Sequence, residues 1–256
     1  MRILRTTLST PRHASLVALV ALSAMALVCS SAPTKAQHFS FGCRDERQIA
    51  LTFDDGPNPP YTEAILGILA SRHARATFFD EGQAVEAHPE LVQQEIDAGM
   101  AIGSHSYAHS MDLPTMPRPD FARDLKRAEA VLSTAAGFKT AIYRAPYGHT
   151  SDSMLIELQR AHYASIGWDI DSTDWSDATA DAVVSAVLDN AHPGAIVLMH
   201  DGGVGGGNPD RTTTLAALPR ILDGLRDQGY ELVTVPELTG TRAKMGDKRG
   251  PVCSAN

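Results

Sequence analysis

Two aspartates stand side by side at the end of an apolar run, where Asp54 and Asp55 close the segment IALTFDD. Further along the chain, the segment SHSYAHS carries His105 and His109 four positions apart. Four positions are one turn of a helix, so both imidazoles can reach a single ion. Such a pair alone is a weak signal and can equally be two surface histidines. Joined by an aspartate from another strand end, it predicts a metal site with a position open for water, as catalytic sites have.

Other polar residues close apolar runs in the same way. Arg144, in YRAPYG, is a fixed cation that can hold a carboxylate in bidentate fashion, and the PYG turn after it can present a backbone N–H to an oxyanion. His200 ends the run IVLMH and is suited to donate a proton to a leaving group. The alternatives are a structural Arg–Asp ion pair and a hydrogen-bonded core histidine.

A scaffold must bring these distant residues together. Seven short apolar runs typical of β-strands cover residues 48–53, 76–79, 101–104, 141–144, 164–168, 195–200 and 231–234. Amphipathic stretches with helical spacing separate them, at residues 61–72, 88–98, 118–136, 151–161, 178–191 and 212–228. This alternation predicts a parallel α/β architecture, and both a barrel and an open doubly wound sheet satisfy it.

In parallel α/β folds, chemistry collects at the carboxyl ends of the strands. Five of the predicted strands end in the unusual polar residues: the two aspartates at 54–55, the histidines at 105–109, Arg144, DIDSTDW at 169–175 and His200-Asp201. Scattered surface charges would not follow strand ends so consistently. The sequence therefore predicts one site on one rim of the sheet or barrel.

The beginning of the chain differs in composition from the rest. Three arginines precede the apolar run 14–29, and small residues follow it. This order predicts a secretory signal peptide over residues 1–36, cleaved after Ala36 or Ala32. The alternative is a membrane anchor, but the run is shorter than the roughly 20 residues of a membrane span. We therefore expect a secreted protein (extracellular, periplasmic or in the cell wall) with no stable membrane insertion after cleavage.

The charge balance narrows the range of partners. Removal of residues 1–36 takes away four of the 22 basic residues and none of the 30 acidic ones, which leaves a net charge of −12. Such a balance argues against nucleic acids and anionic membrane surfaces as partners.

Two cysteines would remain after cleavage, Cys43 and Cys253, near opposite ends of the chain. Export permits disulfides, and the termini of a domain are often neighbours, so we expect a bridge between them. The alternative is two free thiols. No repeat or linker divides the sequence, which predicts a single domain over residues 40–240 and an irregular tail over residues 241–256.

Five motifs, in this order, resemble those of the polysaccharide deacetylases, the metal-dependent enzymes of carbohydrate esterase family 4. They are TFDDGP, SHSYAH, RAPYG, DSTDW and LMH, within a similarity that covers roughly residues 48–238. The resemblance implies a distorted (β/α)7 TIM-like barrel in a single domain. One residue departs from the pattern: Ala145 stands where the third motif commonly has proline. We expect this change to alter the rigidity of the loop slightly rather than to abolish function.

The resemblance implies two roles for the neighbouring aspartates. Asp55, His105 and His109 would be the metal ligands, whereas Asp54 would be the general base. Arg144 would hold Asp54 in place. The family's metal is usually zinc, but two histidines and an aspartate also accept Co2+ and other divalent ions.

The remaining motifs imply the other half of the site. The backbone N–H of Tyr147 would donate to the oxyanion. His200 would be the general acid, with Asp174 orienting it and raising its pKa. Trp175 and Leu198 would form walls of the pocket that receives the acetyl methyl group.

These roles predict a hydrolase that removes N-acetyl groups from glycans containing N-acetylglucosamine, namely chitin, its oligomers or peptidoglycan. O-Deacetylation, for example of acetylated xylan, would use the same residues and is the alternative. A non-catalytic glycan-binding module is a further alternative, and so is a site with a purely structural metal. We expect a monomer whose partner is an acetylated glycan. Loops such as 110–119 and 202–211 would decide which glycan binds.

Overall fold

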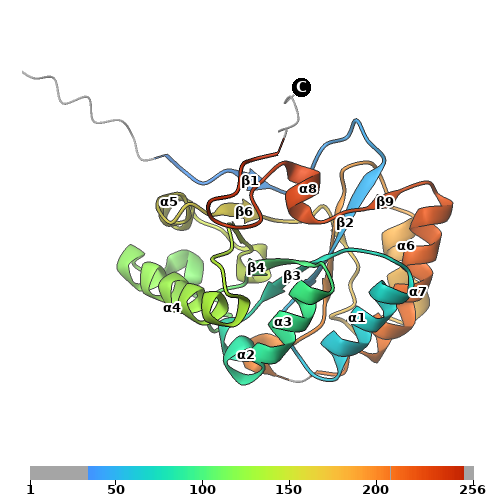
Figure 1. Ribbon diagram of the computed structural model, residues 1–256, viewed down its shortest axis with the longest axis horizontal. Helices are drawn as coiled ribbons and strands as arrows, with labels where there is room; N and C mark the ends of the chain where they lie inside the picture. Colours follow the sequence, from blue (N-terminus) through green and yellow to red (C-terminus); the bar gives the residue numbers. More distant parts are fainter. Residues whose placement is uncertain (1–33, 208, 251–256) are drawn as a thin grey trace, which may run out of the picture. The chain divides into compact units, whose positions relative to one another are not determined.

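The computed structural model describes residues 34–207 and 209–250, which belong to one compact unit (Figure 1). Its strands are β1 (His38–Phe39), β2 (Gln48–Asp54), β3 (Thr77–Asp80), β4 (Ala101–Ser104), β5 (Ile142–Tyr143), β6 (Ala164–Ile166), β7 (Ile170–Asp171), β8 (Ile196–His200) and β9 (Glu231–Leu232). Its α-helices are α1 (Tyr61–Ser71), α2 (Gly82–Ala87), α3 (Pro89–Asp97), α4 (Arg118–Ala136), α5 (Asp152–Arg160), α6 (Ala180–Leu188), α7 (Thr212–Asp227) and α8 (Val235–Thr239). Three short 3-10 helices lie at Leu113–Thr115, Pro146–Gly148 and Val204–Gly206.

The strands pair in parallel in the order β1-β6-β5-β4-β3-β2-β8-β7, and the chain forces this sheet to curl. Only residues 167–169 join β6 to β7, yet these strands lie second and last in the order. In a flat sheet they would stand six strand spacings apart, roughly 29 Å at about 4.8 Å per spacing. The linker reaches at most about 14 Å. The sheet is therefore a distorted barrel, and the protein has an α/β fold. The wall of the barrel consists of seven strands: β2, β3, β4, β5, β6, β7 and β8.

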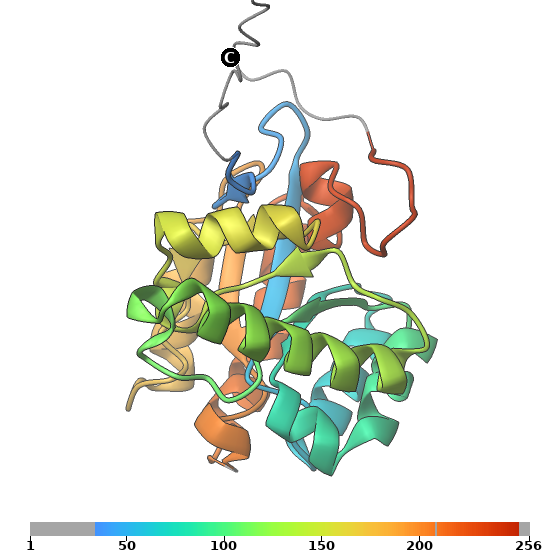
Figure 2. The ribbon, with the colours of Figure 1, turned by 90° about the vertical axis from the view of Figure 1, so that its left-hand side faces the viewer.

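Helices cover the outside of this wall, and their apolar faces build the core. In α1 the buried positions Thr62, Ile65, Leu66 and Leu69 recur at helical spacing and face the sheet. Figure 2 shows α4 and α5 lying across another side of the strands. Each isoleucine or leucine buried in this way contributes about 1.5–3 kcal/mol to folding.

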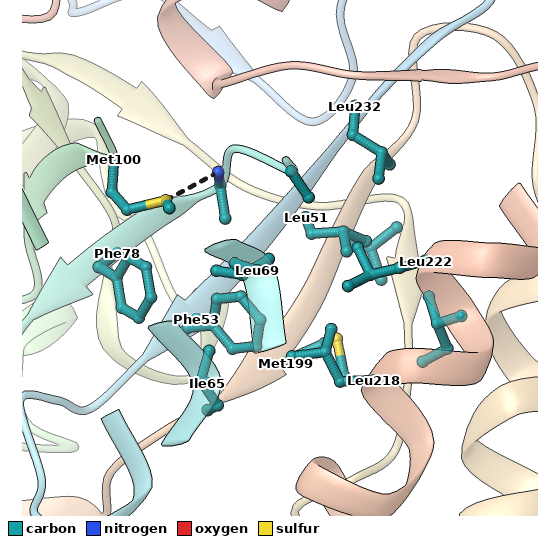
Figure 3. Packing of buried hydrophobic residues seen from close by; sticks show 14 of the residues in the cluster. Leu51, Phe53, Ile65, Leu69, Phe78, Met100, Met199, Leu218, Leu222 and Leu232 are labelled. Atoms are coloured by element: carbon teal, nitrogen blue, oxygen red, sulfur yellow. Dashed lines mark hydrogen bonds between the residues drawn. The ribbon is translucent and has the colours of Figure 1, made fainter. Parts of the chain in front are cut away.

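The largest apolar cluster lies between the sheet and the helices α1 and α7 (Figure 3). Phe53 of β2 and Phe78 of β3 stack there, with ring centroids 5.1 Å apart. The sulfur of Met100 accepts a hydrogen bond of 3.3 Å from the backbone N–H of Ala76. This core holds β2, the strand that ends in the two aspartates, by its middle residues.

Most predicted elements lie where the sequence placed them. The predicted helices correspond to α1, α3, α4, α5, α6 and α7, and α4 begins after Pro117 and ends at Gly137 with φ +76°. The seventh predicted strand is present as β9, but it lies off the main path of the sheet and pairs only with the start of β2, at Gln48 and Ile49. The strand that completes the wall is β7, a two-residue strand that the sequence did not indicate. Strand β1 and helices α2 and α8 were also not predicted.

None of the described helices is both long enough and apolar enough to cross a membrane. Residues 241–250 form no helix or strand, apart from an isolated antiparallel bridge between Lys244 and Thr140. Most of the predicted signal peptide, and Cys253 of the predicted disulfide, lie outside the described residues.

Candidate active site

Backbone strain gathers where the strands end. The φ angles are +73° at Asp55, +67° at Ser106, +51° at His109, +58° at Tyr147 and +60° at Thr173. A residue other than glycine costs on the order of 1–3 kcal/mol in such a conformation and keeps it only where its surroundings enforce it. All five lie in segments that follow β2, β4, β5 or β7 at the same rim. Strain of this kind concentrates at functional sites.

Asp55, His105 and His109 meet in a buried triad. One carboxylate oxygen of Asp55, Oδ1, lies 3.4 Å from Nε2 of His105 and 3.2 Å from Nε2 of His109. This oxygen has no hydrogen-bond partner among the described residues. Ligand atoms about 2.1 Å from one tetrahedral ion are separated by about 3.4 Å. The spacing and the donor types of the triad thus fit a divalent metal ion, and all three side chains are buried.

The sequence predicted the convergence of the two histidines, but the reason was wrong. Residues 105–109 form a loop rather than a helical turn. The left-handed backbone angles of Ser106 and His109 bring the centroids of the two imidazole rings to 4.9 Å from each other. His105 Nδ1 lies 3.0 Å from the carbonyl oxygen of Arg144. Donation of the Nδ1 proton to this carbonyl leaves Nε2 free to bind a metal ion.

Asp54 lies beside the triad but is held by other partners. Nη1 of the fully buried Arg144 donates to Oδ1 of Asp54 at 2.7 Å, and also to the hydroxyl of Thr52 at 2.7 Å. Asp54 Oδ2 remains 3.8 Å from His105 Nε2. Burial raises the pKa of Asp55, but the neighbouring imidazoles of His105 and His109 outweigh it and hold that pKa well below its usual value. The two aspartates thus have distinct environments.

His200 is held by a second acidic group. Asp174 accepts hydrogen bonds from Nδ1 of His200 at 2.8 Å and from its backbone N–H at 2.9 Å. Thr214 of α7 donates its hydroxyl to Oδ2 of Asp174 at 2.7 Å. Burial lowers the pKa of His200, but the hydrogen bond and charge of Asp174 outweigh this and raise the pKa above its usual value. This arrangement suits a residue that donates a proton near neutral pH.

These groups open into one cavity of about 710 Å³. Its lining includes most of the predicted site residues: Asp54, Asp55, His105, His109, Tyr147, Trp175, Leu198 and His200. Arg144 and Asp174 lie behind the lining and contact it through Asp54 and His200. The loop 202–211 borders the cavity, as expected, whereas none of residues 110–119 lines it.

Two aromatic residues of the cavity lining are exposed to solvent, and a third, aliphatic residue of the lining is buried. The side chain of Trp175 is 58% exposed, and its Nε1 donates to Asp171 at 3.2 Å. Tyr147 is 39% exposed, and its ring meets His109 edge to face at 4.5 Å. Leu198 is buried on β8. An aromatic surface next to a polar centre is suited to a sugar ring.

Ala145, the departure in the third motif, keeps the backbone that a proline would have. Its φ is −76° and its ψ is 133°, within the range that the proline ring imposes. The loop shape is therefore preserved by the surrounding structure without the proline.

Some functional residues were missed in the sequence. Trp168, Asp171 and Arg211 line the cavity, and Thr52 and Thr214 orient Arg144 and Asp174 from behind it. Thr52 could have been found, because it lies two positions before Asp54 on the same strand and thus on the same face. Thr214 gives no local signal, since its contact depends on how α7 packs.

The fold and the site define a class: an α/β-barrel protein with a candidate metal centre and paired acid–base groups on its carboxyl rim. Comparisons with known proteins narrow it. The sequence profile described as polysaccharide deacetylase matches residues 41–166. A chitooligosaccharide deacetylase of Sinorhizobium fredii is 36% identical over 195 residues, which cover 74% of this chain and 90% of that protein.

A longer relative shows the same identity. The peptidoglycan-N-acetylglucosamine deacetylase PgdA of Listeria monocytogenes is 36% identical over 203 residues, which cover 79% of this chain and 41% of that protein. Among solved structures, the Bc1960 peptidoglycan N-acetylglucosamine deacetylase matches with a TM-score of 0.76 and 30% identity, over 82% of this chain and 95% of that one.

The chain belongs to the polysaccharide deacetylase family, carbohydrate esterase family 4, and is a deacetylase, hence a hydrolase. The resemblance of the five motifs and the predicted fold class are thereby confirmed. The roles of the individual site residues stay predictions.

Proposed function

We propose that this deacetylase is secreted, depends on a metal ion, and removes N-acetyl groups from glycans that contain N-acetylglucosamine. The candidate substrates are chitin, chitooligosaccharides and peptidoglycan. The enzyme would hydrolyse the C–N bond of a linear amide, which is not a peptide bond. The observation that carries the proposal is the placement of two differently held groups, Asp54 and His200, beside the Asp55 triad in one cavity. The substrates named for the relatives support the sugar class.

Asp55, His105 and His109 would hold the metal ion. A borderline-soft ion such as Zn2+ suits one carboxylate and two imidazoles, and Co2+ or another divalent ion also fits this donor set. When bound, the ion supplies a Lewis acid that polarises the acetyl carbonyl and lowers the pKa of water. The carbonyl of Arg144 would fix the His105 ring for this task.

The chain's own residues would carry the protons. Asp54, with one oxygen bonded to Arg144, would accept a proton from the attacking water on its other oxygen. The backbone N–H of Tyr147 would donate to the oxyanion that forms at the acetyl carbon. His200 is held by Asp174 through its Nδ1 proton and, as the imidazolium, would then donate the proton on Nε2 to the departing nitrogen. Trp175 and Leu198 would enclose the acetyl group.

Side-by-side assays of acetate release from chitooligosaccharide and from acetylated xylan test this proposal. We expect release from the chitooligosaccharide. His200→Ala should reduce that rate by more than it reduces ester hydrolysis, because an amine leaves poorly unless it is protonated. Release from acetylated xylan alone would favour the O-acetyl esterase. Glycan binding without acetate release from either substrate, in protein reconstituted with metal, would favour a non-catalytic module.

Removal of the metal tests a separate part of the proposal. Chelation should abolish activity while the barrel stays folded, because a large apolar core does not need an ion to fold. Readdition of Zn2+ or Co2+ should restore activity, and circular dichroism would follow the fold. Unfolding on chelation would indicate a structural metal instead.

We further propose that residues 1–36 contain a cleaved leader, and that residues 40–240 form the catalytic domain of a monomer. Two contacts support cleavage after Ala32 rather than after Ala36. Lys35 Nζ lies 2.6 Å from Asp152, and the N–H of Ala36 donates to the carbonyl of Leu155 at 2.8 Å. N-terminal sequencing of the exported protein would identify the site.

A disulfide between Cys43 and Cys253 also stays part of the proposal. Counting reactive thiols in the denatured, exported protein before and after reduction would test it. Two thiols that appear only after reduction would support the bridge, and two thiols before reduction would exclude it.

A further inference from the structure

A second cavity, of about 310 Å³, lies at the other end of the strands. Its lining includes Ala141 and Ala164, at the starts of β5 and β6, whereas the active site lies beyond the ends of the same strands. Segments far apart in the sequence enclose it: residues 35–39, the end of α5 with the start of β6, and residues 239–249. Nothing in the proposed reaction uses this cavity.

The charge of this cavity is opposite to that of the chain. Its lining holds Lys35, Arg242, Arg249 and His162, and no aspartate or glutamate. The whole chain, in contrast, has 30 acidic and 22 basic residues. A cluster of cations in an acidic protein creates a local field that attracts anions, whatever the net charge.

Two of these cations have no carboxylate partner among the described residues. Lys35 is paired with Asp152, at 2.6 Å, but within the described part of the chain neither Arg242 nor Arg249 forms a salt bridge. Among the described residues, the hydrogen bond of Arg242 is a long one, from Nη2 to the carbonyl oxygen of His162 at 3.4 Å. A guanidinium with free N–H groups binds a carboxylate or phosphate through two parallel hydrogen bonds.

The rest of the lining is suited to a sugar. Gln37 and Gln159 offer amide donors and acceptors, and Phe39 and Tyr163 offer aromatic carbon. The volume is at the lower end of the roughly 300–1,000 Å³ of ligand pockets. A monosaccharide unit is of a suitable size, whereas the cavity is too small for a chain of several sugars.

We propose that this cavity is a second, non-catalytic binding site for a monosaccharide unit that carries a carboxylate or a phosphate. The oxyanion would lie between Arg242 and Arg249, with the sugar ring toward the amides and aromatic rings. Such a site would allow the enzyme to hold an anionic glycan at one end while the active site works at the other. The proposal rests on the charge and shape of the cavity and is independent of the deacetylase substrate.

Calorimetric titration of the full chain at low salt tests the proposal. Glucuronate and glucose 6-phosphate probe the two oxyanions, and glucose is the neutral control. We expect at least one anion to bind and glucose to bind at least tenfold more weakly. Added salt should lower the affinity for the anion. The anion that binds more tightly identifies the oxyanion for which the site is built.

A matched pair of variants locates the binding. Arg242→Gln should lower the affinity for the anion by about tenfold or more. Arg160→Gln is the control, because Arg160 is an exposed arginine of α5 that bonds Glu157 and does not line the cavity. Acetate release should be unchanged in both variants, which separates this test from that of the proposed function. Equal binding of glucose, no binding of either anion, or equal affinities in the two variants would overturn the proposal.

Discussion

Asp54 and His200 occupy matching positions in the parallel pair of β2 and β8. Residues that are paired in register on neighbouring parallel strands point to the same face of the sheet. Both side chains therefore reach the cavity from adjacent strands. Each is bonded to its own partner, Asp54 to Arg144 and His200 to Asp174. The guanidinium of Arg144 holds Asp54 in place, whereas the carboxylate of Asp174 raises the pKa of His200. A proton acceptor and a proton donor can therefore coexist at neighbouring strand ends.

The neighbouring aspartates predict different losses. Asp54→Asn should keep metal affinity within a few-fold and lower kcat by about 10²–10⁴-fold, because it removes a general base. Asp55→Asn should lower the affinity for the metal ion by more than about tenfold, since it removes a charged ligand. Asparagine tolerates the positive φ of Asp55, so the backbone should be retained. Calorimetric metal titration and acetate release would measure both effects, and equal metal loss in the two variants would contradict the assignment.

The pair of Asp174 and His200 predicts a change in the pH profile. The raised pKa of His200 keeps its acidic form present at higher pH, and activity should fall as pH rises through that pKa. Asp174→Asn removes the main cause of the rise and leaves burial, which lowers the pKa. The alkaline limb of kcat should therefore move to lower pH, with a loss of about 10–100-fold at neutral pH. An unchanged limb would show that His200 is not the acid.

Thr214 provides a finer test of the same pair. Thr214→Val removes the hydroxyl that donates to Asp174 but keeps the side-chain shape. A hydrogen bond to a charged group contributes about 1.5–3 kcal/mol, so kcat should fall by roughly tenfold or more while KM changes little. Thr214→Ser should restore most of the rate. Loss in both variants, or in neither, would show that the hydroxyl does not position Asp174.

Much of the fold was predictable because it depends on local patterns. Apolar runs of strand length alternate with amphipathic helices, and in parallel folds their carboxyl ends meet at one rim. That rule alone placed Asp54, His105, Arg144 and His200 at one site before any contact was known. The resemblance of the motifs then separated the roles of the two aspartates.

The rest depends on tertiary contacts that leave no local pattern. β7 has only two residues, Ile170 and Asp171, too few to show alternation. The loop at His105 and His109 has the spacing of a helical turn but the backbone angles of a strained loop. The enclosing surroundings decide this: the N–H groups of Gly82 and Gln83, at the start of α2, donate to the carbonyls of Ser106 and Tyr107 at 3.0 and 2.9 Å. Since α2 itself was not predicted, neither was the loop.

The alanine in the third motif predicts a gain in stability. Ala145 has a φ of −76°, and its N–H forms no hydrogen bond with the described residues. Ala145→Pro should therefore stabilise the fold by about 0.4–1 kcal/mol, mainly by restricting the unfolded chain. For a domain of this size, that is an increase in Tm of about 1–4 °C. Differential scanning calorimetry would measure it, with activity unchanged; a lower Tm would mean that the buried site has no room for the ring.

A buried acidic pair outside the reaction predicts how stability depends on pH. Glu95 of α3 and Asp80 of β3 are fully buried. Burial raises the pKa of Glu95 well above its usual value, and the charges of Asp80 and Asp201 raise it further. The same causes, burial first and then the charge of Asp201, raise the pKa of Asp80. The two carboxyl groups therefore hold protons in the folded state at a pH where they would lose them in the unfolded chain.

The sign of the effect follows from linkage. A folded state that binds protons more tightly than the unfolded state loses stability as pH rises, from the ordinary pKa near 4.3 up to the raised one. Glu95→Gln removes one of these protons and keeps the shape, so its free energy of unfolding should fall less between pH 5 and pH 9. Each unit of raised pKa corresponds to about 1.4 kcal/mol of this difference. Urea denaturation at several pH values would measure it, with Glu90→Gln, an exposed position on the same helix, as control. If the wild type and Glu95→Gln lose stability in parallel, the buried pair is ionised in the folded protein and its charge is compensated elsewhere.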